Sequence, residues 1–145
     1  MKCPYCSKST KITNSRKTSQ GFEKWRRHSC VSCGNIFTTI ESIDPETALF
    51  VIKKSGDVEP FTNSKILISV YKALDHRSDA QIMAEKLTKN IIVKLLHTPA
   101  KKIPTTLIYE KVINTLKNFD PVGAVKYQST QTPAMNKKDI RRVLK

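Results

Sequence analysis

The 145-residue sequence contains no long apolar segment, and its first residues do not resemble a secretory leader. No apolar run approaches the ~20 residues that a helix needs to cross a bilayer, which excludes a transmembrane helix. The opening residues 1–6 lack the apolar stretch of a signal peptide. We therefore expect a cytoplasmic protein without a membrane partner.

The sequence also lacks the motifs of the common nucleotide folds and catalytic sites. Neither G-x-x-x-x-G-K-[ST] nor G-x-G-x-x-G occurs, which excludes a P-loop and a Rossmann dinucleotide site. We find no Ser/His/Asp group, no His-rich metal cluster and no evident acid–base pair of carboxylates. These absences predict that the protein is not an enzyme.

Acidic residues are scarce: 12 Asp and Glu stand against 26 Lys and Arg, for a formal net charge of +14. Basic surface attracts phosphate, so the charge favours a polyanionic partner. The alternative is that the lysines only keep the protein soluble. Residues 1–45 hold 8 basic and 3 acidic side chains, residues 46–136 hold 13 and 8, and residues 137–145 hold 5 and 1. The basic density is therefore highest at the tail.

Residues 1–41 contain short β-prone runs separated by polar turns. The expected strands are Lys11–Thr13, Phe22–Ser29 and Asn35–Ile40, with a loop over Asn14–Gly21. A region this short cannot bury enough apolar area to fold alone. It therefore needs a stabilising cross-link such as a disulfide or a metal ion.

After a polar link over Glu41–Glu46, the pattern changes to a hairpin and helices. Ala48–Lys53 and Asp57–Phe61 predict two strands joined by a tight turn at Gly56. Four helical segments follow, the first three capped within Thr62–Ser64, by Asp79, and by Thr105 or Thr106, and the fourth running from Pro121 to Tyr127. Pro99 and Pro104 bracket a basic loop. The expected fold class is α+β.

Four cysteines form two Cys-x2-Cys pairs, Cys3 with Cys6 and Cys30 with Cys33. Four thiolates satisfy tetrahedral zinc and leave no position for a substrate water, so one structural Zn²⁺ is the favoured reading. Disulfides, a thioredoxin-like redox motif and an iron site are less favoured alternatives. His28 lies two residues before Cys30, and we expect it to be a surface side chain rather than a ligand.

Basic residues gather between the cysteine pairs around one aromatic residue. Arg16, Lys24, Arg26 and Arg27 are candidates for contact with DNA, because Arg bonds phosphate and guanine edges. Trp25 either packs on DNA or forms the core of the small module, and we favour the core. Strand alternation places Arg26 and Arg27 on opposite faces.

Three lysines cluster near the predicted hairpin: Lys53 and Lys54 beside its turn, and Lys65 in the first turn of the next helix. Lysines beside exposed helix N-terminal amides make an anion site. Taken alone the lysines are a weak signal, and a solvated hairpin is the default interpretation.

Taken together, the two modules resemble the NrdR family, bacterial repressors of ribonucleotide reductase genes. The first module is similar to that family in Met1–Cys6, Asn14–Arg16, Trp25–Gly34 and Phe37–Glu41. The second resembles an ATP-cone from about Leu49 to Gln131, with its marks at Val51–Gly56, Glu59–Phe61, Lys65–Ile66, Ala73–Arg77, Ile103–Thr105 and Asp120–Tyr127.

The resemblance implies a β-rich zinc-ribbon DNA-binding domain over residues 1–45, a hairpin-plus-four-helix ATP-cone over 46–132 and a basic tail over 133–145. It implies a repressor that senses ATP and dATP, binds paired operator boxes in double-stranded DNA upstream of reductase genes, and forms nucleotide-dependent oligomers. Such a protein works in the bacterial cytoplasm, at the nucleoid. The positions that match nucleotide contacts are Val51, Lys53, Lys54, Glu59, Thr62, Lys65 and Thr105.

The sequence departs from the family pattern at Asn14, in the shortened arginine run ending at Arg27, and over Lys126–Ser129. Lys24 cannot copy the bidentate fork of Arg, so operator preference can differ. Two alternatives are an ATP-cone accessory protein that docks on a reductase through protein contacts, and a redox enzyme that uses its cysteine pairs.

Overall fold

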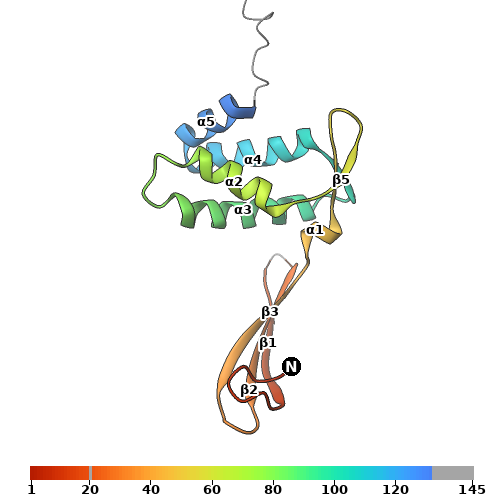
Figure 1. The fold of residues 1–145 in the computed structure, drawn as a ribbon, viewed down its shortest axis with the longest axis vertical. Coiled ribbons are helices and arrows are strands. Elements are labelled where there is room, and N and C mark those ends of the chain that lie inside the picture. The colour runs from red at the N-terminus through yellow and green to blue at the C-terminus, as the bar shows by residue number, and fades with distance from the viewer. Residues whose placement is uncertain (20, 132–145) are drawn as a thin grey trace, which may run out of the picture. The chain divides into compact units, whose positions relative to one another are not determined.

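The computed structural model describes residues 1–19 and 21–131, which divide into two compact units (Figure 1). The first unit is Met1–Asp44, and the second begins at Pro45. No helix within the described ranges is long and apolar enough to cross a membrane. The predicted basic tail, residues 133–145, lies outside the described residues. We describe the two units separately and call them the ribbon and the cone.

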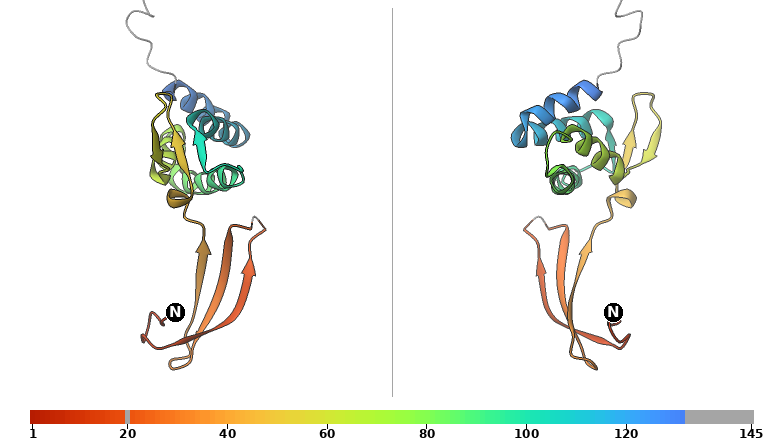
Figure 2. Two further views of the ribbon diagram at one scale, coloured as in Figure 1. Left: turned by 90° about the vertical axis from the view of Figure 1, so that its right-hand side faces the viewer. Right: turned by 60° about the vertical axis from the view of Figure 1, so that its left-hand side comes forward.

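The ribbon is an antiparallel sheet of strand order β1-β2-β3 (Figure 2). Its strands are β1 (Thr10–Lys17), β2 (Glu23–Cys30) and β3 (Ile36–Ser42). The predicted loop over Asn14–Gly21 is wrong for its first four residues, which pair with Lys24–Arg27 after a register shift between Ile12 and Asn14. Nearly all of β1 is exposed, so pairing with β2 rather than an apolar pattern holds it in the sheet.

His28, expected at the surface, is 4% exposed and belongs to the small core of the ribbon. Its ring stacks on Phe37 with centroids 5.1 Å apart. Its Nε2 lies 2.9 Å from Thr39 Oγ1, so the neighbouring strand provides a hydrogen-bond partner for this buried nitrogen. Trp25, expected in the core, is only half-buried. The aromatic core thus lies nearer the cysteines than expected.

The cone contains a three-stranded sheet of order β5-β4-β6. The hairpin of β4 (Phe50–Ile52) and β5 (Val58–Pro60) confirms the predicted pair, and Gly56 turns it with φ of +93°. The predicted basic loop contains instead β6 (Lys102–Pro104), which pairs in parallel with β4. Fully buried Ile103 anchors β6, and a three-residue edge strand tolerates Pro104.

Four helices longer than ten residues pack together beside this sheet, as predicted (Figure 1). They are α2 (Asn63–Ala73), α3 (Ala80–Leu96), α4 (Thr105–Phe119) and α5 (Pro121–Gln131), and a short α1 (Pro45–Ala48) precedes the sheet. Val70, Leu74, Ile91, Leu95 and Leu116 are fully buried in their common core.

Two of the predicted N-cap positions are confirmed: Thr62 precedes α2 and Asp79 precedes α3, although neither side chain makes a cap hydrogen bond. The third prediction is wrong, because Pro104 is the N-cap of α4 and Thr105 is already its first residue. Asp79 is engaged instead by Arg77, whose Nε lies 2.8 Å from Asp79 Oδ1. A neighbouring guanidinium thus competes successfully for the carboxylate that would otherwise cap α3.

Candidate functional site

The four cysteine sulfurs of the ribbon all lie within 4.8 Å of one another. Cys3 Sγ is 3.7 Å from Cys33 Sγ, and Cys6 Sγ is 3.4 Å from Cys30 Sγ. Tetrahedral zinc with Zn–S bonds of about 2.3 Å separates its sulfurs by about 3.8 Å. The cluster therefore fits a Zn²⁺ ion, and it brings together all four residues predicted as ligands.

Each cysteine pair lies on a similar tight turn. The carbonyl of Cys3 accepts from Ser7 N–H at 2.8 Å, and that of Cys30 accepts from Gly34 N–H at 3.2 Å. Ser7 and Gly34, each directly after the second cysteine of its pair, have φ of 59° and 70°. Their positive φ reverses the chain so that both sulfurs of a pair point to one place.

Backbone amides favour the thiolate form of Cys30. The N–H groups of Cys33 and Ser32 donate to Cys30 Sγ at 3.5 and 3.4 Å and lower its pKa to about 6. The side-chain amide of Asn35 donates to Cys33 Sγ at 3.5 Å. Donors of this kind accompany thiolates that bind a metal. The second turn is thus already arranged for metal binding.

The four basic residues predicted to contact DNA divide between the two faces of the ribbon sheet. Trp25 lies opposite Arg16 on β1 and opposite Ile40 on β3, and directly paired residues share a face. By alternation Arg27 lies on that face too. We call Arg16, Trp25, Arg27 and Ile40 the tryptophan face. Both of its arginines are exposed.

Lys24 and Arg26 lie on the opposite face, where Glu41 is the cross-strand partner of Lys24. Arg26 donates to Glu41 Oε2 from Nη2 at 2.6 Å and from Nε at 3.1 Å, and it lowers the pKa of that carboxyl. Arg26 is therefore already paired inside the ribbon, whereas neither arginine of the tryptophan face forms an ion pair with the residues that the structure describes.

The cone contains a pocket of about 230 Å³ between the sheet and helices α2, α4 and α5, which we call the tyrosine pocket. Its lining residues are Val51, Glu59, Pro60, Phe61, Thr62, Lys65, Ile66, Ser69, Thr105, Ile108, Tyr109 and Tyr127. Five of the seven positions that match nucleotide contacts are among them. The other two, Lys53 and Lys54, do not line it. The hairpin and the first turns of α2 and α4 thus meet at one cavity.

Glu59 holds two lysines at this pocket. Its Oε2 lies 2.6 Å from Lys53 Nζ, and its Oε1 lies 2.8 Å from Lys65 Nζ. The hydrogen bond from Lys53 has the largest effect in lowering the pKa of Glu59, and the hydrogen bond from Lys65 adds to it. In return, Glu59 raises the pKa of Lys53. One carboxylate thus orients two cations toward the same region, and this brings Lys53 to the site although it does not line the cavity.

Two tyrosines of the pocket were not predicted as site residues. Tyr109 of α4 and Tyr127 of α5 stack with ring centroids 5.8 Å apart, and burial raises the pKa of Tyr127 to about 12. Tyr127 belongs to a segment that resembles the ATP-cone, which was the available signal. Tyr109 has no such signal, because only the packing of α4 against α5 brings it to the pocket.

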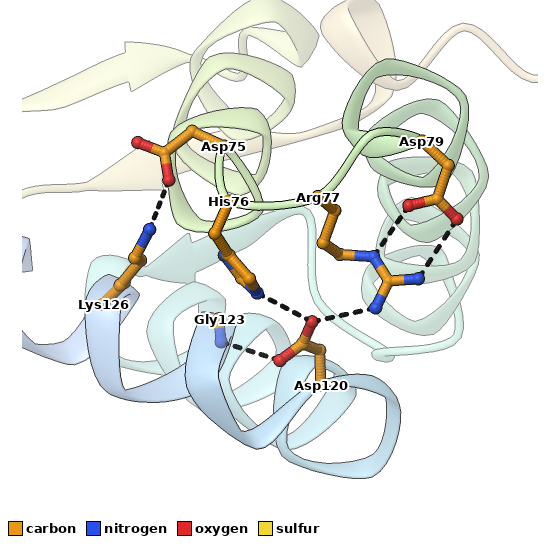
Figure 3. A network of polar contacts seen from close by, with 7 residues as sticks. All are labelled: Asp75, His76, Arg77, Asp79, Asp120, Gly123 and Lys126. Carbon is orange, nitrogen blue, oxygen red and sulfur yellow. Dashed lines mark hydrogen bonds and ion pairs between the residues drawn. The ribbon is translucent and has the colours of Figure 1, made fainter.

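A polar network fixes the start of α5, the helix that carries Tyr127 (Figure 3). Asp120 Oδ1 accepts from Gly123 N–H at 3.0 Å, and Asp120 Oδ2 lies 3.1 Å from both His76 Nε2 and Arg77 Nη1. The Gly123 amide, helped by Arg77 and His76, lowers the pKa of Asp120 to about 2. The network ties the α2–α3 connection to α5.

Two protein families match the chain in the order of its two units. Residues 1–41 match the family described as "Transcriptional repressor NrdR-like, N-terminal domain", and residues 49–130 match the ATP cone domain. The second match alone covers more than half of the 145 residues. The observed ribbon and cone correspond to these two regions.

Curated relatives resemble the chain over most of its length. "Transcriptional repressor NrdR" of Alkaliphilus oremlandii is 38% identical over 130 residues, which is 89% of this chain and 84% of the relative. The protein of the same name from Methylacidiphilum infernorum is 34% identical over 145 residues, 99% of this chain and 87% of the relative. These relatives are named as transcriptional repressors, which are non-enzymatic regulators. This agrees with the prediction that the protein is not an enzyme. With both family matches and this coverage, the chain belongs to the NrdR family of transcriptional repressors.

Proposed function

We propose that this protein binds operator DNA upstream of ribonucleotide reductase genes through its ribbon and adjusts that binding to the ATP and dATP bound by its cone. The observation that carries the proposal is one chain joining a four-cysteine ribbon with an exposed arginine face to a cone with a lysine-bearing pocket. The relatives named as repressors support it.

In the ribbon, Cys3, Cys6, Cys30 and Cys33 hold one structural Zn²⁺. Zinc bound by four thiolates supplies folding energy to a module too small to fold without it. Arg16 and Arg27 of the tryptophan face contact phosphates or base edges, and half-buried Trp25 packs beside them on sugar or base. Lys24 and Arg26 lie on the other face and contribute less to this contact.

In the cone, adenine enters the tyrosine pocket and packs on Val51, which lines it. Lys53, Lys54 and Lys65 neutralise the triphosphate, and Lys53 and Lys65 are already oriented by Glu59. Glu59 accepts from an adenine amine or a ribose hydroxyl, while Thr62 and Thr105 supply hydroxyl groups at the rim. A contact to the ribose hydroxyl that dATP lacks would allow the protein to distinguish ATP from dATP.

Sensing requires that the two nucleotides differ in affinity for two states of the protein. A ligand shifts an equilibrium only by its differential affinity for the states, and the coupling is reciprocal. We propose that these states are oligomers of the chain whose ribbons either match or miss two operator boxes, as the family resemblance implies. The protein is then a cytoplasmic, nucleoid-associated regulator.

The test is operator binding measured with ATP and with dATP at fixed salt and zinc. Affinity that differs between the two nucleotides supports the proposal, and mass measurement in the same buffers reports the oligomer. Equal binding with both nucleotides contradicts sensing. Binding that does not depend on salt contradicts a DNA-binding role, because phosphate contacts release counterions.

A further inference from the structure

The cone has a second pocket, of about 430 Å³, which we call the acidic pocket. Its described lining residues come from α1, α2 and α3, and none of them lines the tyrosine pocket. They are Glu46, Asn63, Ser64, Leu67, Glu85, Thr88, Lys89 and Ile92. Asn63 N–H donates to Glu46 Oε1 at 2.9 Å, which fixes α1 against the start of α2. The pocket is therefore built by three helices rather than by a loop.

Two buried side-chain oxygens in the described part of the chain have no hydrogen-bond partner, and both belong to this pocket. They are Asn63 Oδ1 and Thr88 Oγ1. Thr88 is only 5% exposed. A helical hydroxyl commonly donates to the carbonyl one turn earlier, as Thr115 does to Lys111 at 2.8 Å, but Thr88 does not. A buried polar atom without a partner destabilises the protein unless a ligand or water completes it.

The chemistry of the lining defines what would complete it. Asn63 Oδ1 and the carboxylates of Glu46 and Glu85 accept hydrogen bonds and cannot donate them. Leu67 and Ile92 add apolar surface. The matching ligand therefore carries N–H donors, a positive charge and methylene groups.

The local charge of the lining agrees with this match. Glu46 and Glu85 outnumber the one cation of the lining, Lys89, in a chain whose net charge is +14. The overall field of the protein repels cations, so a cation that binds here does so through local contacts. We infer that the acidic pocket binds a small alkylamine cation, a diamine or polyamine, whose N–H groups donate to Asn63, Glu85 and Thr88 and whose methylenes pack on Leu67 and Ile92.

Calorimetric titration of spermidine into the full-length, zinc-loaded and nucleotide-free protein tests this inference. We expect one saturable site whose affinity falls about tenfold or more in Thr88→Val and in Glu85→Gln, because each loses a hydrogen-bond partner of the amine. Glu110→Gln is the matched control, since Glu110 is an exposed acid of α4 outside the pocket lining, and it should retain the affinity.

Thr88→Val keeps the folded state available, because it replaces an unpartnered buried hydroxyl by a methyl of similar size. Its melting temperature should equal or exceed that of the parent chain. Methyl NMR locates the ligand: shifts at Leu67 and Ile92 support the site, and shifts confined to other methyl groups overturn it. An absence of saturable binding, or equal weakening in Glu110→Gln and Glu85→Gln, also overturns it.

Discussion

Asp120 Oδ1 accepts a hydrogen bond from the backbone N–H of Gly123 at 3.0 Å. The acceptor is the residue just before α5, and the donor lies in the first turn of that helix. This is the geometry of a side-chain N-cap, although sequence analysis did not predict one here. The second oxygen of the same carboxylate serves His76 and Arg77, so one residue both caps α5 and joins it to the α2–α3 connection.

Replacing Asp120 by alanine should lower the free energy of unfolding by about 2 kcal/mol or more, because the cap is lost and Arg77 loses one of its two carboxylate partners. Asp120→Asn keeps an oxygen for the Gly123 amide and should cost less. Chemical denaturation followed by far-ultraviolet circular dichroism measures both. Equal losses of unfolding free energy in the two variants would show that the charge of Asp120, rather than its cap hydrogen bond, accounts for the stabilisation.

The same carboxylate predicts an acid dependence of stability. Its folded-state pKa of about 2 lies below the ordinary value of 3.8, so its contribution is fully present above about pH 5 and is lost as the pH falls toward 2. The stability difference between the parent chain and Asp120→Asn should therefore shrink over that interval. Denaturant titrations of both proteins at matched pH values test this, and a difference that stays constant would contradict it.

Gly123→Ala should destabilise the cone although alanine favours helices. A Cβ at this position would lie 2.9 Å from Leu74 Cδ2 and 3.3 Å from the carbonyl of Ala73, so either the fully buried Leu74 side chain or α5 must shift. Overpacking of this kind costs about 1–3 kcal/mol, more than the ~1 kcal/mol gained in helix propensity. Val125→Ala, at an exposed position of the same helix, is the control and should be near neutral. A Gly123→Ala protein that melts at or above the parent temperature would refute the close contact.

Local patterns predicted the elements whose signals lie within a few residues. The two Cys-x2-Cys turns, the hairpin around Gly56 and the apolar faces of α2, α3 and α4 are of this kind. The end of β1 was missed because Asn14–Lys17 is polar on both faces and is recruited only by pairing with β2. β6 was missed because three residues carry no periodicity, and its parallel partner lies some fifty positions earlier in the chain.

The candidate sites divide in the same way. Cysteine spacing is local, so all four residues of the sulfur cluster were predicted. His28 was misjudged because its burial depends on Phe37 and Thr39 of the next strand. Tyr109 depends on the packing of α4 against α5, and the pairing of Arg26 with Glu41 depends on the register of β2 with β3. Contacts made across elements are what the sequence pattern does not contain.

The division of the ribbon into two faces predicts unequal effects of neighbouring arginines on DNA binding. Arg27→Ala should weaken binding and reduce the slope of log affinity against log salt by about 1, because one phosphate contact is lost. Arg26→Ala should change both much less, since Arg26 is bonded to Glu41. Fluorescence anisotropy with a labelled operator over a range of salt concentrations measures the slopes. A larger effect of Arg26→Ala would assign the DNA contact to the opposite face.

Lys65 and Lys72 offer a matched pair on α2 for testing the proposed nucleotide site. Lys65 lines the tyrosine pocket and bonds Glu59 at 2.8 Å, whereas Lys72 is exposed in the last turn and does not line the pocket. Both substitutions by alanine remove one positive charge, so they affect the long-range field of the protein equally. Only Lys65→Ala removes a cation that can contact the triphosphate, and we expect ATP affinity to fall about tenfold, which corresponds to about 1.4 kcal/mol. Lys72→Ala should retain the parent affinity in the same calorimetric titration. Equal losses would mean that net charge alone attracts the nucleotide, and no loss in either would exclude the tyrosine pocket as its site.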